Sequence, residues 1–219
     1  EPLEPPAWVA KATGPLQSGT VVVLEMLDRL STGYIQSQAF RRNALNHFGL
    51  TYRGVLREMD IAFTDTATGS TTLVQPVDPL FLTPDARFYD ENGVLAEPLP
   101  EIRFVVPDQE DPSRTGAVRV RFSYMPPGFQ GDTAADAKRS PRYAIMRANN
   151  GIIVNRAGRQ IDVVRAVPDE WGYSIGQVYD RNWGCEIDFE PTLDGEFGIT
   201  TNKQQATLSE RMWSLLDNE

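Results

Sequence analysis

Residues 117–124 read Ala-Val-Arg-Val-Arg-Phe-Ser-Tyr, and they give the clearest indication of secondary structure in the chain. Apolar side chains at Val118, Val120 and Phe122 alternate with Arg119 and Arg121, which is the period of a β-strand with one apolar and one polar face. Such alternation is typical of an antiparallel sheet that packs a core on one side only. We therefore expect the arginine face of this strand to lie in water.

Other runs of strand-forming residues lie before and after this stretch. They cover residues 60–64, 71–74, 101–106, 151–155, 160–164 and 185–189. Arg156-Ala157-Gly158-Arg159 separates two of these runs and places Gly where a tight turn needs a positive φ, so it predicts a β-hairpin. The β-branched run from Gly19 to Glu25 predicts a further, buried strand that has no evident partner nearby.

Two segments have helical periodicity. From Tyr34 to Leu56 apolar residues recur about every fourth position, which predicts one helix with Gly49 as its weak point, and residues 206–216 predict a closing helix. Small and charged residues over 128–141 indicate a mobile loop. Together these elements predict an α+β fold, a two-layer sandwich of a mostly antiparallel sheet with helices on one face.

Composition excludes several classes of protein. The chain has 219 residues, of which 41% are hydrophobic, enough for one domain or a domain plus part of another. Its apolar runs are too short to cross a bilayer, so we expect a cytoplasmic protein with no membrane partner. With one cysteine, Cys185, and one histidine, His47, neither a disulfide within the chain nor a His/Cys metal cluster can form. The Pro-rich opening at 1–6, without an initiator Met, suggests a chain that begins inside a longer protein.

Charge is distributed unevenly along the chain. The net charge is −9, yet residues 138–165 carry seven cations and one acid, whereas residues 180–219 are strongly acidic. We expect the two segments to lie close together and to screen each other. An exposed basic face that binds phosphates is the alternative.

Several motifs, taken in order, resemble a known family. They are Ser18-Gly19-Thr20 with the apolar run after it, His47-Phe48-Gly49-Leu50-Thr51-Tyr52-Arg53, Pro76-Val77-Asp78-Pro79-Leu80-Phe81, the hairpin at 150–159, Cys185-Glu186-Ile187-Asp188-Phe189, Leu193-Asp194 and Phe197-Gly198-Ile199-Thr200-Thr201-Asn202-Lys203-Gln204. In this order the chain resembles the end of the nucleotide-binding domain plus the transducer domain of the gyrase B, heat-shock-ninety chaperone, histidine kinase and MutL superfamily of ATPases, nearest to its microrchidia-like and bacterial chaperone-like branches. The resemblance implies a linker and the final strand of an ATPase domain over 1–33, and a transducer-like domain over 34–219.

The resemblance also implies a role for Lys203. In such ATPases the transducer carries a lysine that reaches the γ-phosphate in the neighbouring nucleotide site, which makes Lys203 the catalytic candidate and Asn202 and Lys203 the ATP-binding candidates. The chemistry is reasonable, because phosphoryl transfer depends mainly on electrostatic stabilisation. A lysine from another domain would also report nucleotide state to the rest of the protein.

The ATP-binding half of such enzymes has no counterpart in this sequence. Neither a helix with the catalytic Glu and Asn nor the Asp-x-Gly-x-Gly motif is present. The resemblance therefore assigns ATP and Mg²⁺ to the full-length protein, and we expect this chain alone to need no cofactor and to be inactive. Its implied partners are its own N-terminal ATPase domain, with a second copy and a DNA or protein client left open.

Two other functions are consistent with the residues. A non-enzymatic interaction module would bind nucleic acid or a protein through the basic segment 138–165. A metal-dependent hydrolase would use Glu186 and Asp188, which with Glu190 share one face of a strand, although we interpret that face as solvated.

The remaining chemistry-bearing residues have ordinary structural interpretations. We expect His47 to be a plain helix residue and Cys185 to be buried and inert. Arg156 and Arg159 could meet a phosphate or a partner carboxylate, but we interpret them as residues that keep the turn soluble. The four tryptophans have no common spacing and are interpreted as packing or interface anchors.

Overall fold

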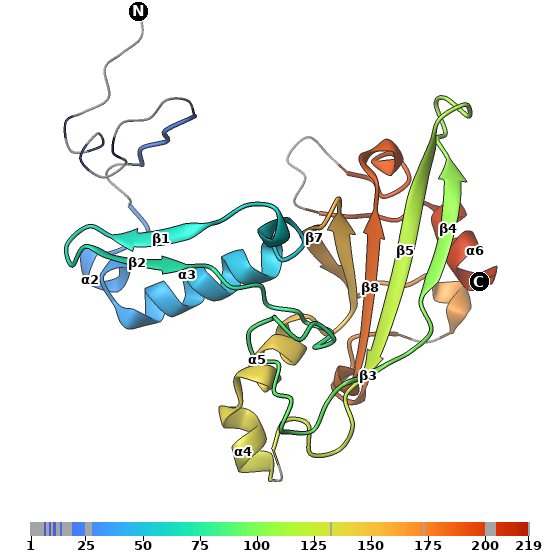
Figure 1. Cartoon of the computed structure of the whole chain (residues 1–219). Coiled ribbons are helices and arrows are strands. Elements are labelled where there is room, and N and C mark those ends of the chain that lie inside the picture. Colours follow the sequence, from blue (N-terminus) through green and yellow to red (C-terminus); the bar gives the residue numbers. More distant parts are fainter. Residues whose placement is uncertain are drawn as a thin grey trace, which may run out of the picture.

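The computed structural model describes residues 19–24, 28–131, 133–172, 174–199 and 205–218, together with residues 7, 9, 11 and 14. The helices are α2 (Thr32–Ile35), α3 (Gln38–Thr51), α4 (Ala134–Arg139), α5 (Pro141–Ala148) and α6 (Glu210–Asn218), with 3₁₀ turns η1 (Val55–Arg57), η2 (Asp169–Trp171), η3 (Val178–Asn182) and η4 (Pro191–Leu193). The strands are β1 (Ala62–Asp65), β2 (Ser70–Leu73), β3 (Glu97–Pro98), β4 (Ile102–Pro107), β5 (Thr115–Tyr124), β6 (Ile152–Arg156), β7 (Arg159–Val164) and β8 (Trp183–Phe189). The expected α+β class is confirmed (Figure 1).

The main sheet has six strands in the order β3-β5-β8-β6-β7, and β4 pairs with the same strand β5 as β3 does. The pairs are antiparallel except for β6 with β8, which is parallel. Arg121 lies opposite Glu186, and Arg119 lies opposite Asp188. Because side chains alternate along a strand, this register puts four charged residues on one face of the sheet.

The β6–β7 hairpin forms as expected. Ala157 has φ of 48° and Gly158 has φ of 76°, so both residues of the two-residue turn are in the left-handed region. That geometry matches the twist of the two flanking strands. Gly158 at the second position adopts a positive φ with little steric strain, because it has no Cβ.

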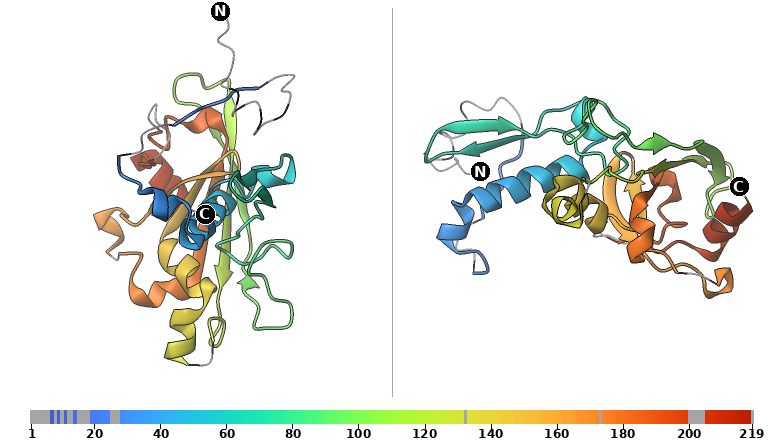
Figure 2. Two further views of the ribbon diagram at one scale, coloured as in Figure 1. Left: turned by 90° about the vertical axis from the view of Figure 1, so that its left-hand side faces the viewer. Right: turned by 90° about the horizontal axis from the view of Figure 1, so that it is seen from below.

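A separate arm is built from α2, α3 and the β1–β2 hairpin. Figures 1 and 2 show it extending away from the main sheet, at the opposite end of the molecule from α6. Phe40 of α3 packs on Phe63 of β1 with ring centroids 6.3 Å apart, and Arg41 donates to the Ser70 hydroxyl at 3.2 Å. These contacts join the hairpin to the helix.

The main core lies between the apolar face of the sheet and α6. Val118, Val120 and Ile187 point into it from the strands, and Met212 points into it from α6. Phe197, fully buried, stacks on Phe189 at a centroid distance of 3.7 Å. The segment after β8 is thereby fixed against the sheet.

Part of the chain also lies over the opposite, polar face of the sheet. A second core contains Val77, Phe81, Met125 and Ile145, and the residues that follow α3 reach the polar face. The polar face of the sheet is therefore partly covered by the chain that follows α3 and by the second core.

The helix expected over 34–56 is three separate elements, α2, α3 and η1. Gly49 does not break it. Gly49 is buried inside α3, where an added Cβ would lie 2.5 Å from the carbonyl oxygen of Gln75, and its own carbonyl accepts from the Val77 N–H at 3.1 Å. The glycine therefore allows the chain at 75–77 to pack closely on the helix.

Three further expectations are wrong. Residues 19–24 form no strand, and Val22 and Leu24 are 76% and 74% exposed, because none of the described strands pairs with this segment. Within 128–141 the chain forms α4, whose first turn is capped by the Thr133 hydroxyl accepting from the Asp136 N–H at 3.1 Å. The closing helix begins at Glu210 rather than 206, after Ser209, whose hydroxyl accepts from the Met212 N–H at 3.1 Å.

No helix in the described part of the chain has the length and apolar content that a membrane span requires.

Candidate functional site

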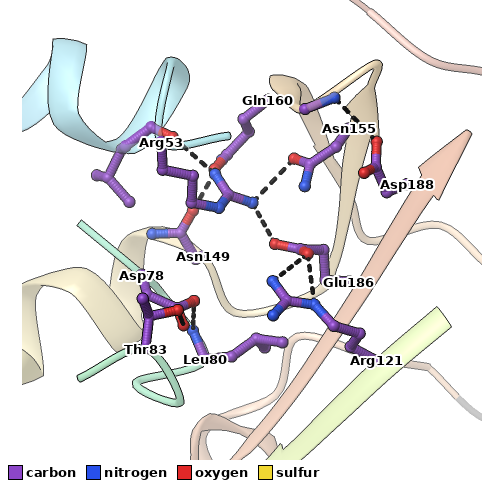
Figure 3. Close-up of polar contacts among 12 residues, drawn as sticks. Arg53, Asp78, Leu80, Thr83, Arg121, Asn149, Asn155, Gln160, Glu186 and Asp188 are labelled. Atoms are coloured by element: carbon purple, nitrogen blue, oxygen red, sulfur yellow. Dashed lines mark hydrogen bonds and ion pairs between the residues drawn. The ribbon is translucent and has the colours of Figure 1, made fainter. Parts of the chain in front are cut away.

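The polar face of the sheet carries a buried group of charged and amide side chains, which we call the Arg53 cluster. It consists of Arg53, Arg121, Asn155, Gln160 and Glu186. Arg53 lies in the turn after α3, and the other members come from strands β5, β6, β7 and β8 (Figure 3). The cluster is the place where the arm meets the sheet.

Two glycines allow this meeting. Gly54, next to Arg53, donates its N–H to the carbonyl oxygen of Gly158 in the β6–β7 turn at 3.2 Å. A Cβ on Gly54 would lie 2.6 Å from that oxygen and 2.7 Å from the Gly158 Cα, so a larger residue would push the two segments apart. Only this close approach brings the Arg53 side chain within reach of β8.

Arg53 is only 8% exposed, and both of its Nη atoms donate hydrogen bonds. Its Nη1 donates to the carbonyl oxygen of Leu50 at 2.6 Å and to Oε1 of Gln160 at 2.7 Å. Its Nη2 donates to Oδ1 of Asn155 at 2.9 Å and to Oε2 of Glu186 (Figure 3). A guanidinium held by four acceptors on four elements, α3, β6, β7 and β8, has a fixed orientation.

Glu186 is the central acid of the cluster, and its side chain is 1% exposed. Arg121 donates to its Oε1 from Nε at 2.9 Å and from Nη2 at 2.5 Å, while Arg53 occupies Oε2. Burial by itself would raise the pKa of Glu186, but the charges and hydrogen bonds of Arg53 and Arg121 outweigh it and lower the pKa to about 2. Glu186 is therefore ionised at neutral pH.

Two further acids lie beside the cluster. Asp188 is 3.4 Å from Nη2 of Arg119 and accepts from the Gly158 N–H at 3.1 Å. Asp78 accepts from the N–H groups of Leu80 and Leu82 at 3.0 and 3.1 Å and so shapes the loop over the polar face. The expectation of a solvated strand face is wrong at Glu186, because the arm and this loop cover it.

The cluster lines a cleft of about 450 Å³. The walls carry equal numbers of arginines and acids, namely Arg53, Arg57, Arg119, Arg121, Asp78, Asp85, Glu186 and Asp188. The charge of the cleft is thus balanced by its own residues. It has no excess of either sign that would attract a charged ligand.

This arrangement is poorly suited to catalysis. A general acid needs a pKa near the working pH, and the pKa of Glu186 is far below it. Both carboxylate oxygens of Glu186 are occupied by guanidinium groups. Within residues 19–24, 28–131, 133–172, 174–199 and 205–218, no group of three or more His, Cys, Asp or Glu side chains is placed to hold a metal ion. The two carboxylates that a metal-dependent hydrolase would use, Glu186 and Asp188, are instead engaged by Arg53, Arg121 and Arg119.

Lys203 and Asn202, the site residues predicted from the sequence, lie outside the described residues. The chain on both sides of them is described. Before them, the Ile199 N–H donates to the Asp194 carbonyl oxygen at 2.9 Å. After them, the Ala206 N–H donates to Oδ2 of Asp162 at 2.9 Å. The described residues on either side of 200–204 are thus hydrogen-bonded to neighbouring parts of the fold.

The basic segment 138–165 is partly neutralised. Arg156 forms a two-bond pair with Asp194, at 2.6 and 2.9 Å, which is the expected screening by the acidic C-terminal segment. Arg142 donates to backbone carbonyls, and its guanidinium carbon lies 4.3 Å from the centre of the Phe129 ring. The exposed cations of the segment include Lys138, Arg139 and Arg147.

His47 is an ordinary helix residue, as expected, whereas Cys185 is half-buried rather than fully buried. His47 is exposed on α3, and its ring contacts Phe48 at 5.8 Å between centroids. Burial, with the nearby charge of Glu186, raises the pKa of the Cys185 thiol to about 12. The thiol is therefore protonated at neutral pH and a weak nucleophile.

Three of the tryptophans pack in aromatic pairs. Trp171 meets Trp213 edge-on at 5.2 Å, and Trp183 packs on Tyr124 at 4.7 Å. Trp8 lies outside the described residues.

The sequence did not single out Arg53 or Arg121 as site residues. A usable signal was present, because Arg119 and Arg121 on one strand and Glu186 and Asp188 on another have the same period of two. If the strands pair, opposite charges face each other across the ladder. In comparisons with known proteins, no family model, no curated protein and no solved structure matches the chain.

Proposed function

We propose that this chain is the transducer part of an ATPase similar to the gyrase B and heat-shock-ninety superfamily. In this proposal an ATP-binding domain elsewhere in the parent protein holds the nucleotide. Lys203 contacts the γ-phosphate, with Asn202 beside it, and the contact passes nucleotide state to the rest of the protein. The proposal starts from the ordered motifs of the sequence, above all Phe197-Gly198-Ile199 with Thr200-Thr201-Asn202-Lys203-Gln204.

The observation that carries the proposal is the anchoring of the chain on both sides of Lys203. Phe197 is buried and stacked in the core on one side, and on the other side the Thr207 N–H donates to the Phe197 carbonyl oxygen at 2.8 Å. In this proposal, fixed flanks lower the conformational entropy that is lost when Lys203 meets a phosphate, compared with a free tail, and they pass a displacement at the lysine on to the core.

The Arg53 cluster suits the same function. A transducer must pass a displacement from one part to another, and this requires parts that move as units. The buried contacts of Arg53 with Gln160, Asn155 and Glu186 hold the arm to the sheet through three strands. In this proposal Mg²⁺ binds together with ATP in the ATP-binding domain.

ATP turnover of the full-length parent protein tests the proposal. Lys203→Ala should reduce turnover by more than about tenfold, which is about 1.4 kcal/mol of barrier, because the lysine neutralises charge on the transferred phosphoryl group. The matched control is Lys138→Ala on α4, an exposed lysine that should leave turnover unchanged. A loss below about tenfold for Lys203→Ala would remove the assigned role.

The coding sequence upstream of Glu1 gives an independent test. A segment with a Glu- and Asn-bearing helix and an Asp-x-Gly-x-Gly motif would support a parent ATPase. A start codon within a few residues of Glu1 would overturn it. The isolated chain should show no stoichiometric ATP binding by calorimetry at micromolar affinity.

A further inference from the structure

A hollow on the far side of the sheet from the Arg53 cluster has a different character. We call it the α6 groove. It runs between the chain at 164–171 and α6, with a volume of about 930 Å³. It leads to an inner cavity of about 350 Å³ between α6 and the apolar face of the sheet. Val167, Trp171, Trp213 and Asp217 line both hollows, so the two are continuous.

The inner cavity is apolar. Its lining includes Phe104, Phe122, Ile152, Ile187 and Leu216, with the Cys185 thiol at the sheet. A cavity of this size lies in the range that proteins use to enclose small ligands or side-chain anchors. Because its lining is apolar, replacing water in it by an apolar group lowers the free energy. The cavity is about large enough for one bulky apolar side chain.

The rim of the α6 groove is acidic. Glu170, Glu210 and Asp217 line it, and all three are exposed. Among the described residues none of the three has an ion pair or side-chain hydrogen bond, and no Lys or Arg lines either hollow. The arginine of α6, Arg211, points elsewhere, since it donates to Oε1 of the buried Glu196 at 2.5 Å. Among the described residues, therefore, no cation balances the negative charge of the rim, in contrast to the cleft of the Arg53 cluster.

We propose that the α6 groove binds a peptide segment of a protein partner in which one bulky apolar residue is flanked by Lys or Arg. The apolar side chain enters the inner cavity, past Trp171 and Trp213. The flanking cations meet Glu170, Glu210 and Asp217 at the rim. A groove with a deep anchor pocket and a charged border is a common way to bind such a segment. The site is independent of the ATPase proposal, because it uses none of the residues assigned there.

The probe is the dansyl-labelled peptide Lys-Arg-Gly-Leu-Gly-Arg-Lys, followed by fluorescence anisotropy with the whole chain. Two comparison peptides replace Leu by Ser or replace each cation by Glu. The Leu peptide should bind at least about tenfold more tightly than either, because it alone meets both the cavity and the rim. Equal binding of the Leu and Ser peptides would overturn the anchor assignment.

Charge variants distinguish binding to the acids of the groove from non-specific attraction by the overall charge of −9. The groove variant is Glu170→Gln/Glu210→Gln/Asp217→Asn. The control variant removes three exposed acids away from the groove, Glu58→Gln/Glu91→Gln/Glu110→Gln. We expect at least about tenfold weaker binding for the groove variant and less than about twofold for the control. Equal loss in the two variants would mean non-specific attraction and would overturn the proposal.

Two measurements check the inner cavity. Leu216→Trp should fill it and reduce binding at least about tenfold, with circular dichroism and the melting temperature reporting that the variant still folds. Cys185, the one cysteine of the chain, lines the cavity, so bound peptide should slow its alkylation. Unchanged binding by Leu216→Trp, or unchanged alkylation at saturating peptide, would refute the cavity as the anchor site.

Discussion

Replacing Glu186 by Gln is the sharpest test of the Arg53 cluster. The substitution keeps the shape of the side chain and one acceptor oxygen but removes the negative charge between two guanidinium groups. The side chain of Glu186 is 1% exposed, and the side chains of Arg53 and Arg121 are 7% and 21% exposed. The cations left behind would therefore have little access to water. The variant should fold into a protein with a markedly lower free energy of unfolding.

The size of the loss can be estimated in two ways. Breaking a buried ion pair by removing one partner costs about 3–5 kcal/mol. The pKa of Glu186 is lowered from 4.5 to about 2, and this difference corresponds to about 3 kcal/mol of interaction with the charged form. We expect a loss of about 3 kcal/mol, which lowers the melting temperature of a chain of this size by about 6–12 °C.

Urea unfolding, followed by tryptophan fluorescence and circular dichroism, measures this loss at neutral pH. The same comparison at lower pH gives a second check. The folded pKa of Glu186 lies below the unfolded one, so its stabilisation is fully present above about 4.5 and is lost as the pH falls toward about 2. The difference between native protein and variant should therefore shrink over that window.

A matched control is Glu101→Gln. Glu101 also pairs with an arginine, Arg103, but that arginine is 70% exposed, so the loss should stay below about 1 kcal/mol. If Glu186→Gln costs no more than Glu101→Gln, or if its cost does not change with pH, the ion pairs of Glu186 do not hold the arm to the sheet.

Three further predictions concern packing and reactivity. Gly54→Ala should cost about 1–3 kcal/mol by urea unfolding, because its Cβ would lie 2.6 Å from a backbone oxygen, whereas Gly195→Ala, with nothing within 4 Å, should be neutral; equal effects would argue against the close approach. Phe197→Ala should cost about 3–5 kcal/mol in thermal unfolding, since the ring is fully buried, and a loss below about 1 kcal/mol would contradict its place in the core. Cys185, with a pKa of about 12, should react with iodoacetamide at least about a hundredfold more slowly in the native protein than in urea, and similar rates would show an accessible thiolate.

Much of the fold could be predicted from local patterns. The alternation at Val118, Val120 and Phe122 predicted β5, and the Ala157-Gly158 turn predicted the β6–β7 hairpin, because strand period and turn chemistry depend on residues close together in sequence. Helix ends were less accurate. The end of α3 after Thr51 depends on contacts that the chain at 75–77 and the β6–β7 turn make with it, and no local pattern contains those contacts.

The candidate site depends even more on tertiary contacts that no local pattern contains. The sequence alone determined that Arg119 and Arg121 share a strand face and that Glu186 and Asp188 share another. A face in water and a buried polar layer have the same period of two, so the sequence could not distinguish them. The register of β5 with β8 set the arginines opposite the acids, and Arg53 reached Glu186 across 133 residues of chain. Only the tertiary structure made that layer a buried joint, because burial of a charge depends on which distant segment arrives with its counter-charge.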